Sequence, residues 1–216
     1  MEEKIIEEEP WYKGPLKYIL GIFLIFLIVL MVLPHYTVKL DPEPKRIAKV
    51  EEVLLTNIVL SNKSYTLKTR QDFVDFLNKN DPVIKQAADK IVTIGCEESR
   101  VCNAKAIYYF VRDNIQYVND PVNFEYVEEP REVLVTKAAD CESGTFLLAS
   151  LMKAIGIDSE LVFIPGHAFL RIKLDEALKR YKRDGYVYLD WTCKSCKFGE
   201  IPYQNINARK EFLEIY

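Results

Sequence analysis

Residues 137–157 read KAADCESGTFLLASLMKAIGI, and in this stretch a cysteine stands just before a strongly apolar run. Apolar side chains recur at helical spacing from Phe146 to Ile155, and Gly156 can supply a left-handed stop. The pattern therefore predicts a helix over residues 141–156. Because apolar residues cover most of its circumference, we expect this helix to be central and buried.

Cys141 would lie at the amino terminus of that helix. Unpaired backbone N–H groups and the positive end of the helix dipole favour thiolate over thiol there, which is how a fold prepares a nucleophile. Neighbouring carboxylates would oppose the thiolate if they faced it, so we expect Asp140 to cap the helix and Glu142 to face solvent. The alternative is that Cys141 is a small buried hydrophobe, and the choice depends on a nearby base.

The sequence contains two histidines, and only one is placed to act as that base. His35 lies beside Pro34 at the edge of a long apolar segment, where an interfacial role is expected. His167 follows a Pro-Gly turn and begins an expected strand, HAFLRIKL. Asp190 is the single carboxylate of a mostly apolar strand, YVYLDWT, and burying it is costly without a partner. An imidazole N–H from the neighbouring strand would satisfy it.

These three residues predict a catalytic triad. Cys141 would attack a carbonyl as thiolate, His167 would carry the proton, and Asp190 would fix the tautomer and orientation of the imidazole. A second donor would join the backbone N–H of Cys141 in holding the developing oxyanion. The sequence does not assign it. Three upstream amides could supply it, although the ordinary loop role is the favoured interpretation of each: Gln116, Asn119 and Asn123.

Helices are expected before the Cys141 segment and strands after it. Turn residues and apolar periodicity predict a hairpin at 53–60 and 65–67, helices at 70–77, 82–95 and 102–117, and a further helical turn from Pro130. Apolar or β-branched runs predict antiparallel strands at 161–164, 168–174 and 186–191, with a helical turn or charged loop at 176–183. The predicted fold class is α+β, with helices packed on an antiparallel sheet.

The amino-terminal part of the chain has the character of a membrane anchor. Residues 18–38 carry no formal charge, and residues 19–33 are apolar apart from one glycine, close to the roughly 20 residues that cross a bilayer. The leader is more acidic than basic and no small-x-small site follows, which favours an uncleaved anchor over a signal peptide. Lysines lie on both sides, so charge does not set the orientation. The expected domains are a flank at 1–17, an anchor at 18–38, a linker at 39–50 and a catalytic domain at 51–216.

Five cysteines suggest where the domain lies. Cys96 with Cys102 and Cys193 with Cys196 form two local pairs, and Cys141 is left over. In an oxidising compartment the four would form two disulfides, which favours an extracytoplasmic domain. Three pairings are possible and the local one is our choice. A four-thiolate zinc site made by these four residues is the alternative, although only the CKSC half has the usual spacing.

Three separated motifs, in this order, resemble the transglutaminase-like superfamily of cysteine enzymes. They are Ala139-Asp140-Cys141 with the helix that follows, Pro165-Gly166-His167-Ala168-Phe169, and Leu189-Asp190-Trp191-Thr192, and the resemblance spans residues 101–196. The upstream segment AKAIYYFVRDNIQYV is also similar to the helix that precedes the nucleophile in that family. Ala139 departs from the glycine that family members commonly carry, which raises the question of whether the turn keeps its usual shape. The resemblance implies a papain-like core with a Cys-His-Asp triad and thiol acyl chemistry without metal or cofactor.

Two functions of different class follow. The first is a single-pass membrane enzyme that hydrolyses amide bonds in peptide or protein substrates, with hydrolysis favoured over crosslinking because no second substrate module is visible to exclude water. The second is a transglutaminase-like binding or assembly module that has lost turnover. The expected partners are the substrate and the lipid bilayer. Nucleic acid is not expected, because the net charge is −3 and no basic stripe is present.

Overall fold

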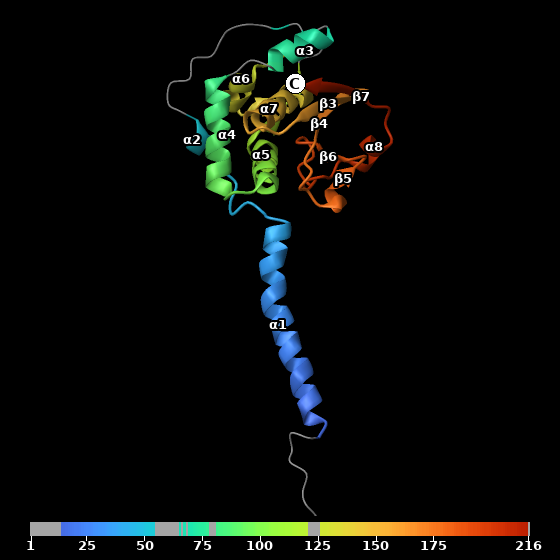
Figure 1. Ribbon diagram of the computed structural model, residues 1–216. Helices are drawn as coiled ribbons and strands as arrows, with labels where there is room; N and C mark the ends of the chain where they lie inside the picture. Colours follow the sequence, from blue (N-terminus) through green and yellow to red (C-terminus); the bar gives the residue numbers. More distant parts are fainter. Residues whose placement is uncertain are drawn as a thin grey trace, which may run out of the picture. The chain divides into compact units, whose positions relative to one another are not determined.

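The computed structural model describes residues 14–54, 65, 67, 69–77, 81–120 and 126–215, with the backbone only at 34–39 (Figure 1). The chain divides into two compact units, Met1–Leu40 and Asp41–Tyr216. The domain boundaries predicted from the sequence stay predictions.

The first unit contains a single long helix among its described residues, α1 (Leu16–Leu40). Its segment Leu16–Leu33 is long and apolar enough to cross a membrane, and none of it is buried against protein. Exposed leucine, isoleucine and phenylalanine side chains surround the helix on all sides, as they do in a helix whose solvent is lipid. Length and composition fit a single-pass anchor or a signal sequence.

The second unit is α+β, which confirms the predicted fold class. Its helices in the described ranges are α2 (Val50–Val53), α3 (Arg70–Leu77), α4 (Pro82–Gly95), α5 (Arg100–Asn114), α6 (Pro130–Thr136), α7 (Cys141–Ala154) and α8 (Tyr203–Ile206). Its strands there are β1 (Gln116–Tyr117), β2 (Ala138–Ala139), β3 (Ser159–Ile164), β4 (His167–Ile172), β5 (Lys182–Arg183), β6 (Tyr186–Leu189) and β7 (Glu211–Ile215).

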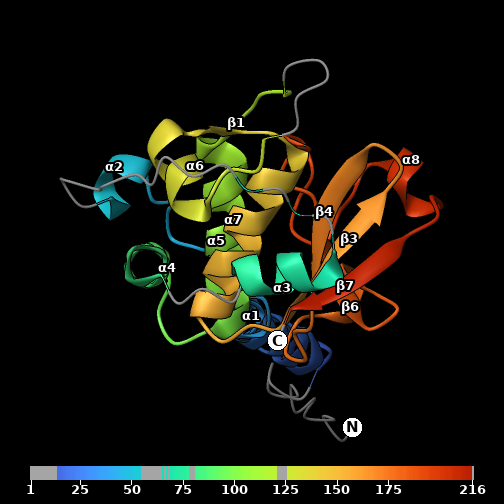
Figure 2. The same cartoon turned by 90° about the horizontal axis from the view of Figure 1, so that it is seen from above.

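Helix α7 is the centre of this unit, as its apolar circumference predicts. It contacts α4, α5 and α6 on one side and strands β3 and β4 on the other. Figure 2 shows it between the helices and the sheet. Phe146, Leu147, Leu148, Leu151 and Met152 are all fully buried. The helix ends just before Gly156, whose φ of +71° is the expected left-handed conformation.

The main sheet is antiparallel, with strand order β5-β6-β4-β3-β7. In the β4–β6 register Leu170 lies opposite Leu189, so the end of β6 runs beside the start of β4. That register brings the residue after β6 close to His167. Strand β7 pairs with β3 at the edge of the sheet, so the segment 198–216 completes the sheet, one of the two roles expected for it from the sequence.

Several predicted bounds differ from the structure. The strand predicted at 186–191 ends at Leu189, so Asp190 lies just beyond it and not within it. The helix predicted at 102–117 ends at Asn114, because the N–H of Gln116 turns away to donate to the carbonyl of Lys137 at 2.8 Å and begins the parallel β1–β2 pair. The hairpin predicted at 53–60 and 65–67 lies mostly outside the described residues. Its first residue, Val53, is the last residue of helix α2 and not part of a strand.

Four cysteines form the two local disulfides, Cys96–Cys102 and Cys193–Cys196, and Cys141 is free. The four sulfurs of the alternative zinc site are therefore bonded in pairs. The zinc alternative is wrong, because zinc would need these sulfurs as four thiolates. The described residues contain no other group of three or more histidine, cysteine or carboxylate side chains arranged to hold a metal ion.

The segment that leads into the second unit is tied to helix α5. Lys105 is fully buried, and its ammonium lies 2.6 Å from carboxylate oxygens of both Asp41 and Glu43. Burial favours the neutral amine, but the hydrogen bonds to these two carboxylates outweigh it and raise the pKa of Lys105. Ala48 and Val50 are buried as well. Much of the predicted linker thus packs on the domain.

Candidate active site

Cys141 is the first residue of α7, and its backbone setting matches the capping argument. The carboxylate of Asp140 accepts the N–H of Ser143 at 2.8 Å and caps the helix. Glu142 is half-buried, whereas we had expected it to face solvent. Ala139 belongs to strand β2, and its φ is not positive. The turn therefore accepts alanine where the related family commonly has glycine.

The side chain of His167 is hydrogen-bonded to that of Asp190. Nε2 of the imidazole lies 2.9 Å from Oδ2 of the carboxylate, which is fully buried. The other oxygen, Oδ1, accepts the backbone N–H and the hydroxyl of Thr192 at 3.1 and 2.7 Å. The amide of Asn205 approaches Oδ2 at 3.5 Å. The buried carboxylate is thus satisfied by an imidazole and by three polar groups that the sequence did not indicate.

The imidazole also contacts the nucleophile candidate, so the structure brings all three predicted residues together. Burial of the ring favours its neutral form, but hydrogen bonds with Asp190 and Cys141, and the charges of both, outweigh burial and raise the pKa of His167 to about 9. A proton on the ring is therefore favoured at neutral pH. Cys141 itself is only half-buried and stays accessible.

Trp191 fixes the end of β6 against the first turn of α7. Its indole is fully buried, and Nε1 donates to the carbonyl of Cys141 at 3.3 Å. The contact is possible because residue 144 is glycine: a Cβ there would lie 2.1 to 2.8 Å from atoms of the indole. Thr145 adds a second link, since its hydroxyl bonds the carbonyls of Cys141 and Ala168. The sequence did not reveal these contacts, although glycine inside an apolar helix is a signal of close packing.

Tyr117 lies at the rim of the same site, and sequence reasoning missed it. Strand β1 pairs with β2 so that Tyr117 is opposite Ala139, two residues before the thiol. Burial, followed by the charges of Cys141, Asp140 and Asp120, raises the pKa of Tyr117, which indicates that its hydroxyl lies within the field of the thiol. The hydroxyl donates to Oδ1 of Asn119 at 2.7 Å.

The amides predicted as oxyanion donors have other surroundings. Gln116 is exposed, Asn119 accepts the Tyr117 hydroxyl, and Asn123 lies outside the described residues.

Glu128 lies beside the first turn of α7, because its backbone N–H donates to the hydroxyl of Ser143. Burial, and then the charges of Glu132, Asp140 and Asp120, raise the pKa of Glu128 to about 7.

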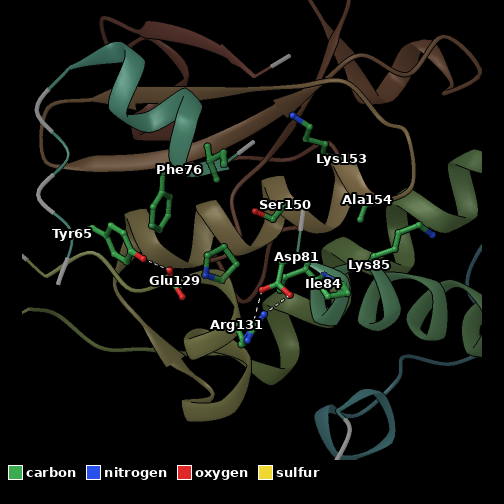
Figure 3. A pocket seen from close by; sticks show the side chains of 13 residues that line it. Tyr65, Phe76, Asp81, Ile84, Lys85, Glu129, Arg131, Ser150, Lys153 and Ala154 are labelled. Carbon is green, nitrogen blue, oxygen red and sulfur yellow. Dashed lines mark hydrogen bonds and ion pairs between the residues drawn. The ribbon is translucent and has the colours of Figure 1, made fainter. Parts of the chain in front are cut away.

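A cavity of about 800 Å³ lies elsewhere on α7, between α3, α4 and α6 (Figure 3). Phe76, Ile84 and Ala154 form part of its apolar wall. Ion pairing between Asp81 and Arg131 marks one side. None of the three site residues is among its described lining, so this cavity is separate from the candidate site at the helix mouth.

The family model described as the transglutaminase-like superfamily matches residues 85–191, a range that includes Cys141, His167 and Asp190. No curated protein and no solved structure matches the chain.

Proposed function

The chain carries a transglutaminase-like superfamily domain at residues 85–191, and on this premise we propose that it is a cysteine hydrolase acting on amide bonds of peptide or protein substrates. The superfamily generally uses cysteine-based catalysis. The observation that carries the proposal is the double engagement of His167, which hydrogen-bonds the buried Asp190 and the free, accessible Cys141.

The proposed acylation step uses the proton that His167 holds at neutral pH. A protonated ring beside the sulfur and the first turn of α7 both stabilise the thiolate of Cys141. The thiolate attacks the amide carbon, the C–N bond breaks, and His167 gives its proton to the departing amine. Asp190 holds the ring through Nε2, which leaves Nδ1 for the sulfur and for the substrate.

Deacylation reverses the role of the ring. Neutral His167 takes a proton from water as the oxygen attacks the thioester carbon, and the C–S bond breaks to release the acid and restore the thiolate with a protonated imidazole. Hydrolysis is favoured over transfer to an amine because Cys141 is only half-buried and water reaches the thioester.

Two donors are proposed for the oxyanion that forms in both steps. The backbone N–H of Cys141 is in the first turn of α7, where N–H groups have no partner within the helix. The Tyr117 hydroxyl is the second, because the β1–β2 pairing places Tyr117 opposite Ala139, two residues before the thiol. Removing one such donor typically lowers the rate about a hundredfold. We expect that loss for Tyr117→Phe.

The domain is proposed to lie outside the cytoplasm, anchored by α1. Its two disulfides persist in oxidising compartments and are rare in the cytosol. Helix α1 is long enough to serve as the anchor. The substrates of the enzyme are then peptides or proteins at the outer face of the membrane.

The test is acylation of the full chain in detergent by p-nitrophenyl acetate. We expect a burst of nitrophenolate, an acetyl group on Cys141 by mass spectrometry, and continued turnover to acetate. His167→Ala should lose the burst and Cys141→Ser should lose acetylation altogether. A wild-type rate equal to that of His167→Ala would overturn the proposal and favour the non-catalytic module.

A second arm separates hydrolysis from transfer. A fluorescent primary amine is added during turnover, and the acetyl group is followed to water or to the amine. We expect acetate to remain the main product at every amine concentration up to the millimolar range. If acetylated amine dominates at millimolar amine, the enzyme is a transferase and not a hydrolase.

A further inference from the structure

The carboxylate of Asp190 is held by a loop and not by the sheet. Strand β6 ends at Leu189, so Asp190 is the first residue beyond the strand. The chain from Asp190 continues through Trp191 into the segment that the Cys193–Cys196 disulfide closes. Whether Asp190 reaches His167 therefore depends on what fixes this loop, residues 190–196.

Tyr108 of helix α5 joins the two ends of loop 190–196. Its side chain is fully buried, and its hydroxyl lies 3.2 Å from the carbonyl oxygen of Asp190 and 3.2 Å from that of Cys196. A phenol has one proton to donate, so the two carbonyls share it. The hydroxyl thus connects the residue that binds His167 to the second cysteine of the disulfide.

Two cationic side chains attach the same loop to α5. Arg112 donates to the carbonyl of Cys196 at 2.8 Å. Lys194, inside the disulfide ring, donates to the carbonyl of Ile115 at 2.7 Å and to that of Arg112 at the end of α5. Loop 190–196 is therefore bound to one helix at its beginning, its middle and its end.

We propose that Tyr108 is a positioning residue for Asp190, and that the Cys193–Cys196 disulfide supports the same task. Neither touches the substrate or the sulfur of Cys141. Their role is to keep the Asp190 carboxylate at 2.9 Å from Nε2 of His167. Hydrogen bonds weaken steeply with distance and angle, and a site needs its groups held within about 0.5 Å, so a small shift of the loop would release the imidazole.

The decisive comparison is between two adjacent tyrosines. Tyr108→Phe removes the hydroxyl that contacts Asp190 and keeps the ring. Tyr109→Phe is the matched control. The Tyr109 hydroxyl accepts the backbone N–H of Phe198, just after the loop, at 3.2 Å, but it does not contact Asp190. Both residues belong to α5, so the two variants perturb the same helix.

The first readout is the titration of His167 by NMR in the full chain in detergent micelles. The sequence has only two histidines, and His35→Gln identifies the other signal. We expect Tyr108→Phe to lower the pKa of His167 from about 9 towards its usual value, and Tyr109→Phe to leave it unchanged. A merely structural tyrosine would lower stability without moving this pKa.

The second readout is the rate of alkylation of Cys141 by iodoacetamide near pH 7. Loss of one neutral hydrogen bond corresponds to roughly a two- to tenfold change in an equilibrium. We therefore expect Cys141 of Tyr108→Phe to be alkylated more slowly than that of the wild type, by a factor in the same range. Folded Tyr108→Phe with wild-type titration and wild-type alkylation would overturn the proposal.

The disulfide gives an independent arm if Tyr108→Phe fails to fold. The double variant Cys193→Ser/Cys196→Ser opens the loop, and Cys96→Ser/Cys102→Ser removes the other disulfide as a control. We expect only the first to lower the pKa of His167, and equal effects of the two would overturn the role of the loop. Both readouts report the His167–Asp190 pair without turnover, so the enzymatic proposal can fail while this one stands.

Discussion

His167 links the chemistry of the site to the stability of the domain. Its pKa in the folded domain is about 9, above its ordinary value of 6.5. A raised histidine pKa means that the folded state holds a proton more tightly than the unfolded state does. The resulting stabilisation is fully present below pH 6.5 and is lost as the pH rises towards 9.

We therefore predict that the free energy of unfolding decreases between pH 7.5 and pH 9, with a slope of up to about 1.4 kcal/mol per pH unit. Urea unfolding of the full chain in detergent, followed by tryptophan fluorescence, measures it. The window starts above the pKa of Glu128, about 7, so that most of this carboxyl is already ionised.

His167→Gln is the control for that slope, because glutamine cannot gain the proton. The difference between wild type and variant isolates the histidine from every other group. Asp190→Asn should also flatten the slope, since its carboxylate is a principal cause of the raised pKa. A wild-type slope that persists in His167→Gln would contradict the assignment.

The site residues differ in how far the sequence could predict them. Cys141 was recognisable from its place before an apolar helix, and Asp190 from the cost of burying a lone carboxylate. Tyr117 and Tyr108 gave no such signal, because a tyrosine within a predicted helix is interpreted simply as a packing residue. Which atom a tyrosine hydroxyl reaches depends on loops that are close only after folding.

At the scale of elements, the packing of Trp191 on α7 sets how close the sheet comes to the helix mouth. A methyl group at position 144 would lie 2.1 to 2.8 Å from the indole, well inside contact distance. We predict that Gly144→Ala lowers the free energy of unfolding by about 1–3 kcal/mol, the usual cost of overpacking, even though alanine is the better helix former. It should also slow acylation of Cys141, because the indole that bonds its carbonyl must move.

Ser150→Ala on the same helix is the comparison for this variant, since the chemical change is small and the position is far from Trp191 along α7. We expect it to change stability by less than about 0.5 kcal/mol and acylation not at all. Denaturant unfolding and the nitrophenyl acetate burst give both quantities. Gly144→Ala with unchanged stability would show that the indole moves freely.

Long elements were predictable and short ones were not. The periodicity of α4 and α7 extends over several turns, so their bounds follow closely from the sequence. Strands β1 and β2 have two residues each, too few for any alternation, yet they bring Tyr117 beside Cys141. Residues 198–216 were expected to complete or cover the sheet, but the bounds of strand β7 were not predictable, because its sequence, EFLEI, places charged residues among apolar ones.

At the scale of the whole molecule, the proposed extracytoplasmic arrangement rests on two independent features, the apolar helix α1 and the two disulfides. The helix needs lipid around it, and the disulfides need an oxidising compartment. The lysines that flank α1 do not decide the orientation. The cysteines offer a test of the proposed orientation, because one free thiol and four disulfide-bonded sulfurs can be labelled selectively from one side of a membrane.

We predict that a membrane-impermeant maleimide modifies one cysteine, Cys141, on intact cells that express the full chain, and that Cys141→Ser abolishes the labelling. Prior treatment with an impermeant phosphine should raise the count, because it reduces the two disulfides and frees the partly exposed Cys96 and Cys193, whereas Cys102 and Cys196 are buried. Mass spectrometry of the purified chain gives the sites and the count. Labelling that requires permeabilised cells would place the domain inside. Four further thiols without any reductant, together with bound zinc, would mean that the cysteines ligate metal.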